Sequence, residues 1–84
     1  MKPIRLSGHA QDQLHRRGGS EQEVVEAISS SSWEPANQGR FECSKNFPYH
    51  NEWNGKRYDT KQVRPIFVDE ADEIVVITVY TYFF

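Results

Sequence analysis

The sequence predicts an α+β fold, with two N-terminal helices packed on a three- to four-stranded antiparallel sheet as a two-layer sandwich. Two observations favour this class. The apolar residues of positions 1–30 recur at helical spacing, whereas from Arg40 onward the apolar positions recur with a period of two. Because a helix with one apolar stripe and a sheet with one apolar face each need a covering layer, a helix layer on a sheet layer buries both.

Capping signals define the two helices. Ser7 is a suitable N-cap for a helix that runs to about Arg17, and the two glycines that follow are expected to end it. Ser20 and Glu23 have the spacing of a capping box, which opens a second helix. The sequence therefore predicts two consecutive short helices joined by a tight connection.

The strands follow from alternation and turn signals. Residues 40–47 alternate apolar and polar, which predicts a strand with one buried face. Asn54 and Gly55 predict a hairpin turn, because both residues tolerate positive φ. A further strand is expected over about residues 61–68. Pro65 cannot donate to a ladder there, so it predicts a bulge or an unpaired side.

The segment 74–84 is the most informative part of the chain. It consists almost wholly of β-branched and aromatic residues, which favour a strand. Both of its faces are mostly apolar, so it is expected inside the sheet rather than at an edge. Thr78 and Tyr80 place hydroxyls on one otherwise apolar face. The acidic residues of segment 69–73 form the turn that leads into this strand.

Length and composition limit the class of protein. The chain of 84 residues is expected to be a single domain, 1–84, and its only cysteine, Cys43, excludes an internal disulfide framework. No apolar segment is long enough for a signal peptide or a membrane span, so a cytoplasmic location is expected. The histidines and Cys43 lack the spacing of a ligand set, and neither a metal nor a cofactor is expected.

The charge distribution leaves two interpretations open. The net charge is −2, but four of the acids are concentrated in the turn at 69–73. The segments 1–20 and 54–65 are each basic, and the fold can bring them together as one basic face for a nucleic acid. The alternative is a solvated surface with ordinary charge clustering.

Several short motifs resemble a small bacterial family. They are His9-Ala10, Leu14, Arg17-Gly18 and Ser20 near the start, Lys61–Phe67 in the middle and Ile74–Tyr80 at the end. These motifs are similar to domain-of-unknown-function family 4258, and the middle segment resembles its cyanobacterial versions. The resemblance covers about residues 5–82. It implies the helix-then-sheet fold of RelE-type toxin ribonucleases.

The resemblance also implies site residues. His9 and Arg17 on the helix, and Thr78 and Tyr80 on the last strand, match motif positions of the family. The sequence departs from the family at Gln13, where an arginine is common, and at Gly19, where an isoleucine is common. The missing cation at Gln13 weakens a phosphate-binding function.

Metal-independent cleavage of RNA needs a base, an acid and cations around the phosphate. His9 can serve as base or acid, Arg17 and Arg64 can hold phosphate oxygens, and Tyr80 or Tyr82 can donate a proton or stack on a base. The predicted catalytic residues are His9, Arg17, Arg64 and Tyr80. The predicted RNA-binding residues are Arg16, Lys56, Arg57, Lys61, Thr78 and Tyr82.

Each of these residues also has a structural interpretation. His9 can be a surface or capping residue, Arg17 can neutralise the helix dipole, and Thr78 and Tyr80 are good strand formers. At the level of function, the main hypothesis is a toxin-like domain that binds and cleaves RNA, with an antitoxin-like protein as a second partner. The alternative is a non-catalytic module that binds a protein through its sheet or its aromatic segment 47–53. The protein is expected to be a monomer or a homodimer.

Overall fold

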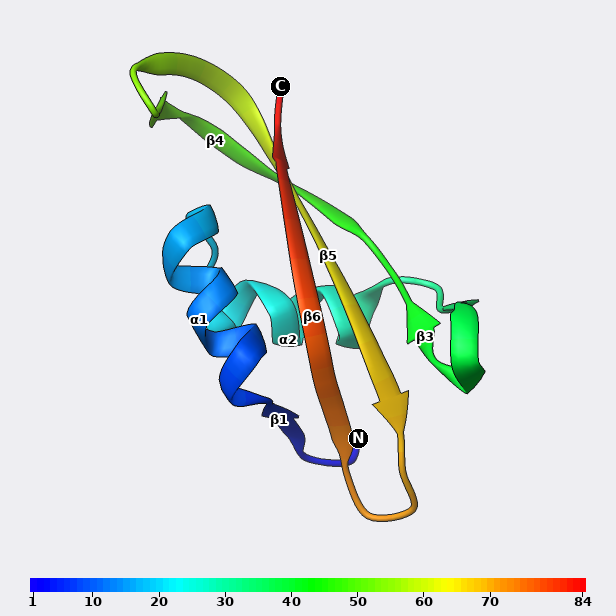
Figure 1. Cartoon of the computed structure of the whole chain (residues 1–84). Coiled ribbons are helices and arrows are strands. Elements are labelled where there is room, and N and C mark those ends of the chain that lie inside the picture. Colours follow the sequence, from blue (N-terminus) through cyan, green and yellow to red (C-terminus); the bar gives the residue numbers. More distant parts are fainter.

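The computed structural model describes all residues from Met1 to Phe84. The elements are β1 (Ile4–Leu6), α1 (Gly8–Arg17), α2 (Glu21–Ser30), β2 (Glu34–Pro35), the 3-10 turn η1 (Asn37–Gly39), β3 (Phe41–Glu42), β4 (Lys45–Trp53), β5 (Lys56–Asp69) and β6 (Ile74–Phe83). Both helices contribute to one apolar cluster with strands β5 and β6, so both cover the same face of the sheet. Figure 1 shows α2 behind β5 and β6, and α1 alongside β6.

The α+β class is confirmed, but the sheet is larger than expected and it is mixed. Its six strands have the order β1-β6-β5-β3-β2, and β4 also pairs with β5. β1 runs parallel to β6, with Ile4 opposite Ile74. The expected three to four antiparallel strands therefore describe only part of the sheet. The additional strands contain two or three residues each, too short for a period-two pattern.

The predicted helix signals are confirmed in detail. The Ser7 hydroxyl accepts a hydrogen bond from the Ala10 N–H, and Gly18 ends α1 in the left-handed region at φ 71°. Ser20 and Glu23 form the reciprocal capping box of α2. These caps end α1 and begin α2 within a few residues, so the two helices are separate elements.

The hairpin signal is also confirmed. Asn54 and Gly55 join β4 to β5 with φ values of 54° and 80°, as a type I′ turn requires. Pro65 lies opposite the Cys43–Ser44 segment, where the paired strand is interrupted between β3 and β4. The carbonyl of Pro65 accepts from the Cys43 N–H, but its nitrogen has no proton to donate. The missing donor accounts for the interruption.

A β-bulge in β6 decides which side chains face the helices. The pairing with β5 passes from Val76 directly to Thr78, so Ile77 has no partner of its own. Beyond this residue the alternation is reversed. Val79 joins Val76 in the core, and Tyr80 turns to the opposite face.

The helix-covered face holds the core. Its cluster of 12 buried residues consists of Leu6, Ala10, Leu14, Val24, Ala27, Ile28, Cys43, Val63, Phe67, Ile74, Val76 and Val79. Phe67 is fully buried, and its ring meets Trp33 edge-to-face with centroids 4.9 Å apart. Aromatic contacts of this kind stabilise beyond the area they bury. The opposite face is left free of helices.

Candidate functional site on the open face of the sheet

The open face is the side of the sheet that no helix covers, and four of the predicted site residues lie on it. Its central residues are Glu42, Gln62, Arg64, Ile66, Thr78, Tyr80 and Tyr82. Cross-strand pairing puts Tyr80 directly opposite Arg64, Thr78 opposite Ile66 and Tyr82 opposite Gln62. All of these side chains are at least partly exposed. The register therefore gathers a cation, phenols and a hydroxyl on one accessible surface.

The last residues of β6 and the residue after it form a row of exposed aromatic side chains. Tyr80, Tyr82 and Phe84 are 39%, 44% and 58% exposed, and the only other exposed large hydrophobic residue is Met1. The three aromatic residues alternate along the chain, so their side chains stand about 7 Å apart on the same face. Exposed aromatic residues in a row are unusual for a surface that only needs to be soluble.

Arg17 lies beside this row. Its guanidinium carbon is 5.1 Å from the centre of the Tyr80 ring, which is cation–π distance. Its Nη1 also donates to the Val79 carbonyl at 2.8 Å. Arg17 and Tyr80, two of the predicted catalytic residues, are therefore in contact, but neither lines any of the four cavities of the protein. The two groups meet on an open surface rather than in a hollow.

Side chains of α1 bind both the N–H and the carbonyl of Val79. Gln13 is buried, and its side-chain oxygen accepts from the Val79 N–H at 2.9 Å, while Arg17 binds the carbonyl of the same residue. These contacts satisfy the outer edge of β6 where β1 has ended. An arginine at position 13 has no acceptor for this N–H, so the glutamine has a structural function here.

Gly19, the second departure from the family pattern, also fits its surroundings. A Cβ atom at this position would lie 2.7 Å from a methyl carbon of Leu14. An isoleucine here requires the Leu14 side chain to move.

Glu42 is a site residue that the sequence did not reveal. Its carboxylate accepts a hydrogen bond from Arg64 at 2.6 Å. The pKa of Arg64 is raised, mainly by this hydrogen bond and by the charge of Glu42, and to a smaller extent by Tyr82. The polar side of the 40–47 pattern contains Glu42, but its pairing with Arg64 depends on a register between strands that lie 22 residues apart. The pair places a carboxylate and a cation together on the open face.

His9 does not join this group. It lies exposed in the first turn of α1, eight residues before Arg17, which corresponds to about 12 Å along the helix axis. It takes part in none of the ion pairs of the structure. The structure therefore separates His9 from Arg17 and Tyr80.

The predicted RNA-binding cations have three different environments. Lys61 is buried, donates to the Gly18 carbonyl at 2.9 Å and pairs with Glu23 at 2.8 Å, so its ammonium group is occupied inside the protein. Arg16 is exposed in the last turn of α1. Lys56 and Arg57 are exposed beside the hairpin turn, away from the open-face centre.

The two basic segments approach each other where α1 ends. A Cβ atom at Gly18 would lie 2.8 Å from the Trp53 ring, and the backbone of Trp53 pairs with that of Lys56 across the hairpin. Trp53 stacks on Phe83 with centroids 5.1 Å apart, and Tyr49 meets the same ring edge-to-face. The aromatic segment 47–53 is thus partly used for packing the hairpin against α1.

Other reactive groups lie away from the open-face centre. Burial raises the pKa of the Cys43 thiol to about 11, which keeps it protonated near neutral pH. His50 and Asp59 form an exposed pair at 3.4 Å near the hairpin. The structure has no cluster of three or more potential metal ligands, and none of its helices is long and apolar enough to cross a membrane.

Comparison with family models, with curated proteins and with solved structures gave no match in any of the three. The resemblance to family 4258 and to RelE-type toxins therefore stays a prediction. The site has to be interpreted from its own geometry.

Proposed function

We propose that this protein is a toxin-like domain that binds single-stranded RNA on the open face of its sheet and cleaves it without a metal ion. The observation that carries the proposal is the aromatic row Tyr80, Tyr82 and Phe84 with two guanidinium groups beside it. Unpaired bases stack on exposed aromatic rings, and each such contact contributes about 1–3 kcal/mol. Arg17 and Arg64 are suitably placed to hold the backbone phosphates of a strand that follows β6.

The same surface contains the groups that the chemistry requires. In this proposal Glu42 takes the proton of the ribose 2′-hydroxyl, and the 2′-oxygen attacks the adjacent phosphorus. The bond from phosphorus to the 5′-oxygen breaks, and Tyr80 or Tyr82 gives that oxygen a proton. Arg64 and Arg17 stabilise the charge that develops on the phosphate. The products are a 2′,3′-cyclic phosphate and a 5′-hydroxyl.

Glu42 replaces His9 as the proposed base because of its location. The carboxylate is held at 2.6 Å from Arg64, whereas His9 lies on the first turn of α1, away from Arg17 and Tyr80. A base must lie within hydrogen-bond reach of the proton that it removes. A position beside the phosphate-binding arginine meets that requirement.

Binding and cleavage are tested separately with a labelled single-stranded RNA of mixed sequence. The double change Tyr80→Ala and Tyr82→Ala is expected to weaken binding by about tenfold or more, because two stacking contacts are lost. Arg64→Ala is expected to weaken binding as well, and Arg5→Ala is its matched control, since both arginines pair with a glutamate but Arg5 lies on the edge strand β1. Unchanged binding of RNA by the double variant contradicts the proposal.

Glu42→Gln tests the chemistry. The glutamine keeps the size of the side chain but cannot accept the proton, so cleavage is expected to fall by at least about a hundredfold with binding preserved. Expression of the protein in a bacterial host is expected to slow growth, and Glu42→Gln is expected to relieve the effect. Normal growth together with no cleavage of RNA by the pure protein contradicts the ribonuclease activity.

A second candidate function is a non-catalytic module that binds a protein partner through its sheet. The exposed apolar row also suits such a partner, and the net charge of −2 does not favour RNA. In this case the Tyr80 and Tyr82 variants lose the partner in a pull-down, Glu42→Gln retains it, and no variant affects RNA. Partly buried Tyr49 and Trp53 are the less suitable anchors, since both pack on Phe83.

A further inference from the structure

A cavity of about 500 Å³ lies between the 3-10 turn η1 and strand β5, next to the open face. It is lined by Pro35, Ala36, Asn37, Gln38, Arg40, Glu42 and Ile66. The turn that forms one wall has Gln38 and Gly39 in the left-handed region, at φ 62° and 73°. A volume of this size accommodates a nucleoside.

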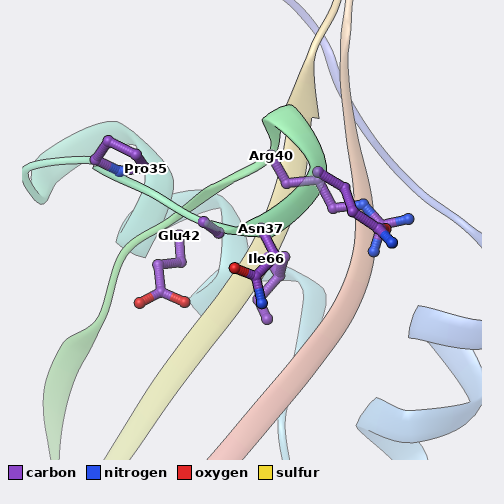
Figure 2. A pocket seen from close by; sticks show the side chains of 7 residues that line it. Pro35, Asn37, Arg40, Glu42 and Ile66 are labelled. Atoms are coloured by element: carbon purple, nitrogen blue, oxygen red, sulfur yellow. The ribbon is translucent and has the colours of Figure 1, made fainter.

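The lining of the cavity is mostly polar, and Pro35, Ala36 and Ile66 offer its apolar contacts. Figure 2 shows Arg40 and Glu42 extending to opposite sides, with Asn37 and Ile66 between them. Arg40 takes part in none of the ion pairs of the structure, whereas the Glu42 carboxylate is held by Arg64. The guanidinium of Arg40 is therefore available to a ligand.

The charges indicate what kind of ligand fits. One cation and one carboxylate line the cavity, so their charges balance, and the other lining side chains are neutral. A neutral, planar group with hydrogen-bonding edges matches this balance, and it can lie against Pro35 and Ile66. A nucleobase meets these conditions.

We propose that this cavity binds a guanine base of the RNA, with Arg40 donating to its O6 and N7 atoms. An arginine fork matches the two acceptors of guanine, whereas adenine has an amino group where guanine has O6. The proposal rests on the proposed RNA function for its ligand. Ile66 lies two residues from Arg64, about 7 Å along β5, so the cavity can hold the base of a nucleotide whose phosphate is bound at Arg64.

The cavity is tested with the full chain and two uncharged probes, guanosine and adenosine, by calorimetry or NMR titration. Guanosine is expected to bind about tenfold more tightly or better, which corresponds to one bidentate pair. Arg40→Ala is expected to remove this preference, and Arg40→Lys is expected to retain only a part of it, because an ammonium lacks the planar fork. Arg5→Ala serves as the control, because Arg5 lies on β1 at the opposite end of the sheet from the cavity, and thermal melts verify that each variant is folded.

The outcomes separate this inference from the proposed function. Equal binding of guanosine and adenosine, or a preference that survives Arg40→Ala, overturns the guanine site even if RNA is still bound on the open face. Guanosine binding that depends on Arg40 in a protein that neither binds nor cleaves RNA supports the cavity and overturns the RNA function. Loss of guanosine preference in Arg40→Ala with unchanged binding of an oligo(U) strand supports both.

Discussion

The two faces of this sheet are built from the same strands but have opposite character. On the helix-covered face, Val63 and Phe67 of β5 and Val79 of β6 are fully buried. On the open face, Arg64 and Tyr80 directly follow Val63 and Val79 in the sequence and remain accessible. Because successive strand residues point to opposite faces, one pair of strands can supply both the core and a binding surface. Core residues and proposed binding residues therefore alternate along these strands, so a substitution can change either the stability of the fold or the proposed function.

The largest difference between the faces is expected from removing a side chain from each. Phe67→Ala on the helix-covered face is expected to lower the free energy of unfolding by about 3–5 kcal/mol, because it leaves a cavity in the core. Tyr82→Ala on the open face is expected to change it by about 0.5 kcal/mol or less. Urea denaturation of both variants measures the contrast. Similar losses would show that the open face also carries the fold.

Gln13 tests whether the contact between α1 and the edge of β6 is structural. Gln13→Ala is expected to cost about 1–3 kcal/mol, because the buried Val79 N–H loses its acceptor. Chemical denaturation measures this loss, with exposed Gln11→Ala on the same helix as the control. An effect no larger than that of the control would mean that this hydrogen bond contributes little.

The buried thiol on the helix-covered face predicts a pH dependence. Folding raises the pKa of Cys43 from 9.0 to about 11, so the folded state retains its proton more strongly than the unfolded state. The protonated thiol therefore favours the folded state fully below about pH 9. As the pH rises from 9 toward 11, the unfolded state loses its thiol proton first, and the free energy of unfolding falls by about 1.4 kcal/mol per pH unit. Stability is compared at pH 8 and pH 10 in the native chain and in Cys43→Ala, which removes this component. Identical losses in the two proteins contradict the assignment.

The smallest effect on stability is expected from the ion pair on the open face. Arg64→Ala, Glu42→Ala and the double variant form a cycle whose coupling energy is expected to be about 0.2–1 kcal/mol, because the Arg64 side chain is 41% exposed and its pair is screened by water. The same variants are expected to have large effects on RNA binding or cleavage. A coupling energy of several kcal/mol would instead assign the pair to the fold.

Local signals were sufficient for the helices and for the hairpin. Ser7 and Ser20 mark the helix starts, Gly18 marks the end of α1, and Asn54-Gly55 marks the turn, because each acts through hydrogen bonds or dihedral angles within a few residues. The parallel pairing of β1 with β6 could not be predicted, since three residues show no periodicity and their partners lie 70 residues away. The pairing of Glu42 with Arg64 depends on strand register in the same way.

The face on which Tyr80 lies shows this division most clearly. Simple alternation places Thr78 and Tyr80 on the same side as Ile74 and Val76, and the sequence alone supports no other assignment. The bulge at Ile77 reverses the alternation, so that Val79 enters the core and the phenol of Tyr80 faces solvent opposite Arg64. Strand propensity is a property of the local sequence. The face that each side chain occupies depends on the register with β5, which only the packed sheet determines.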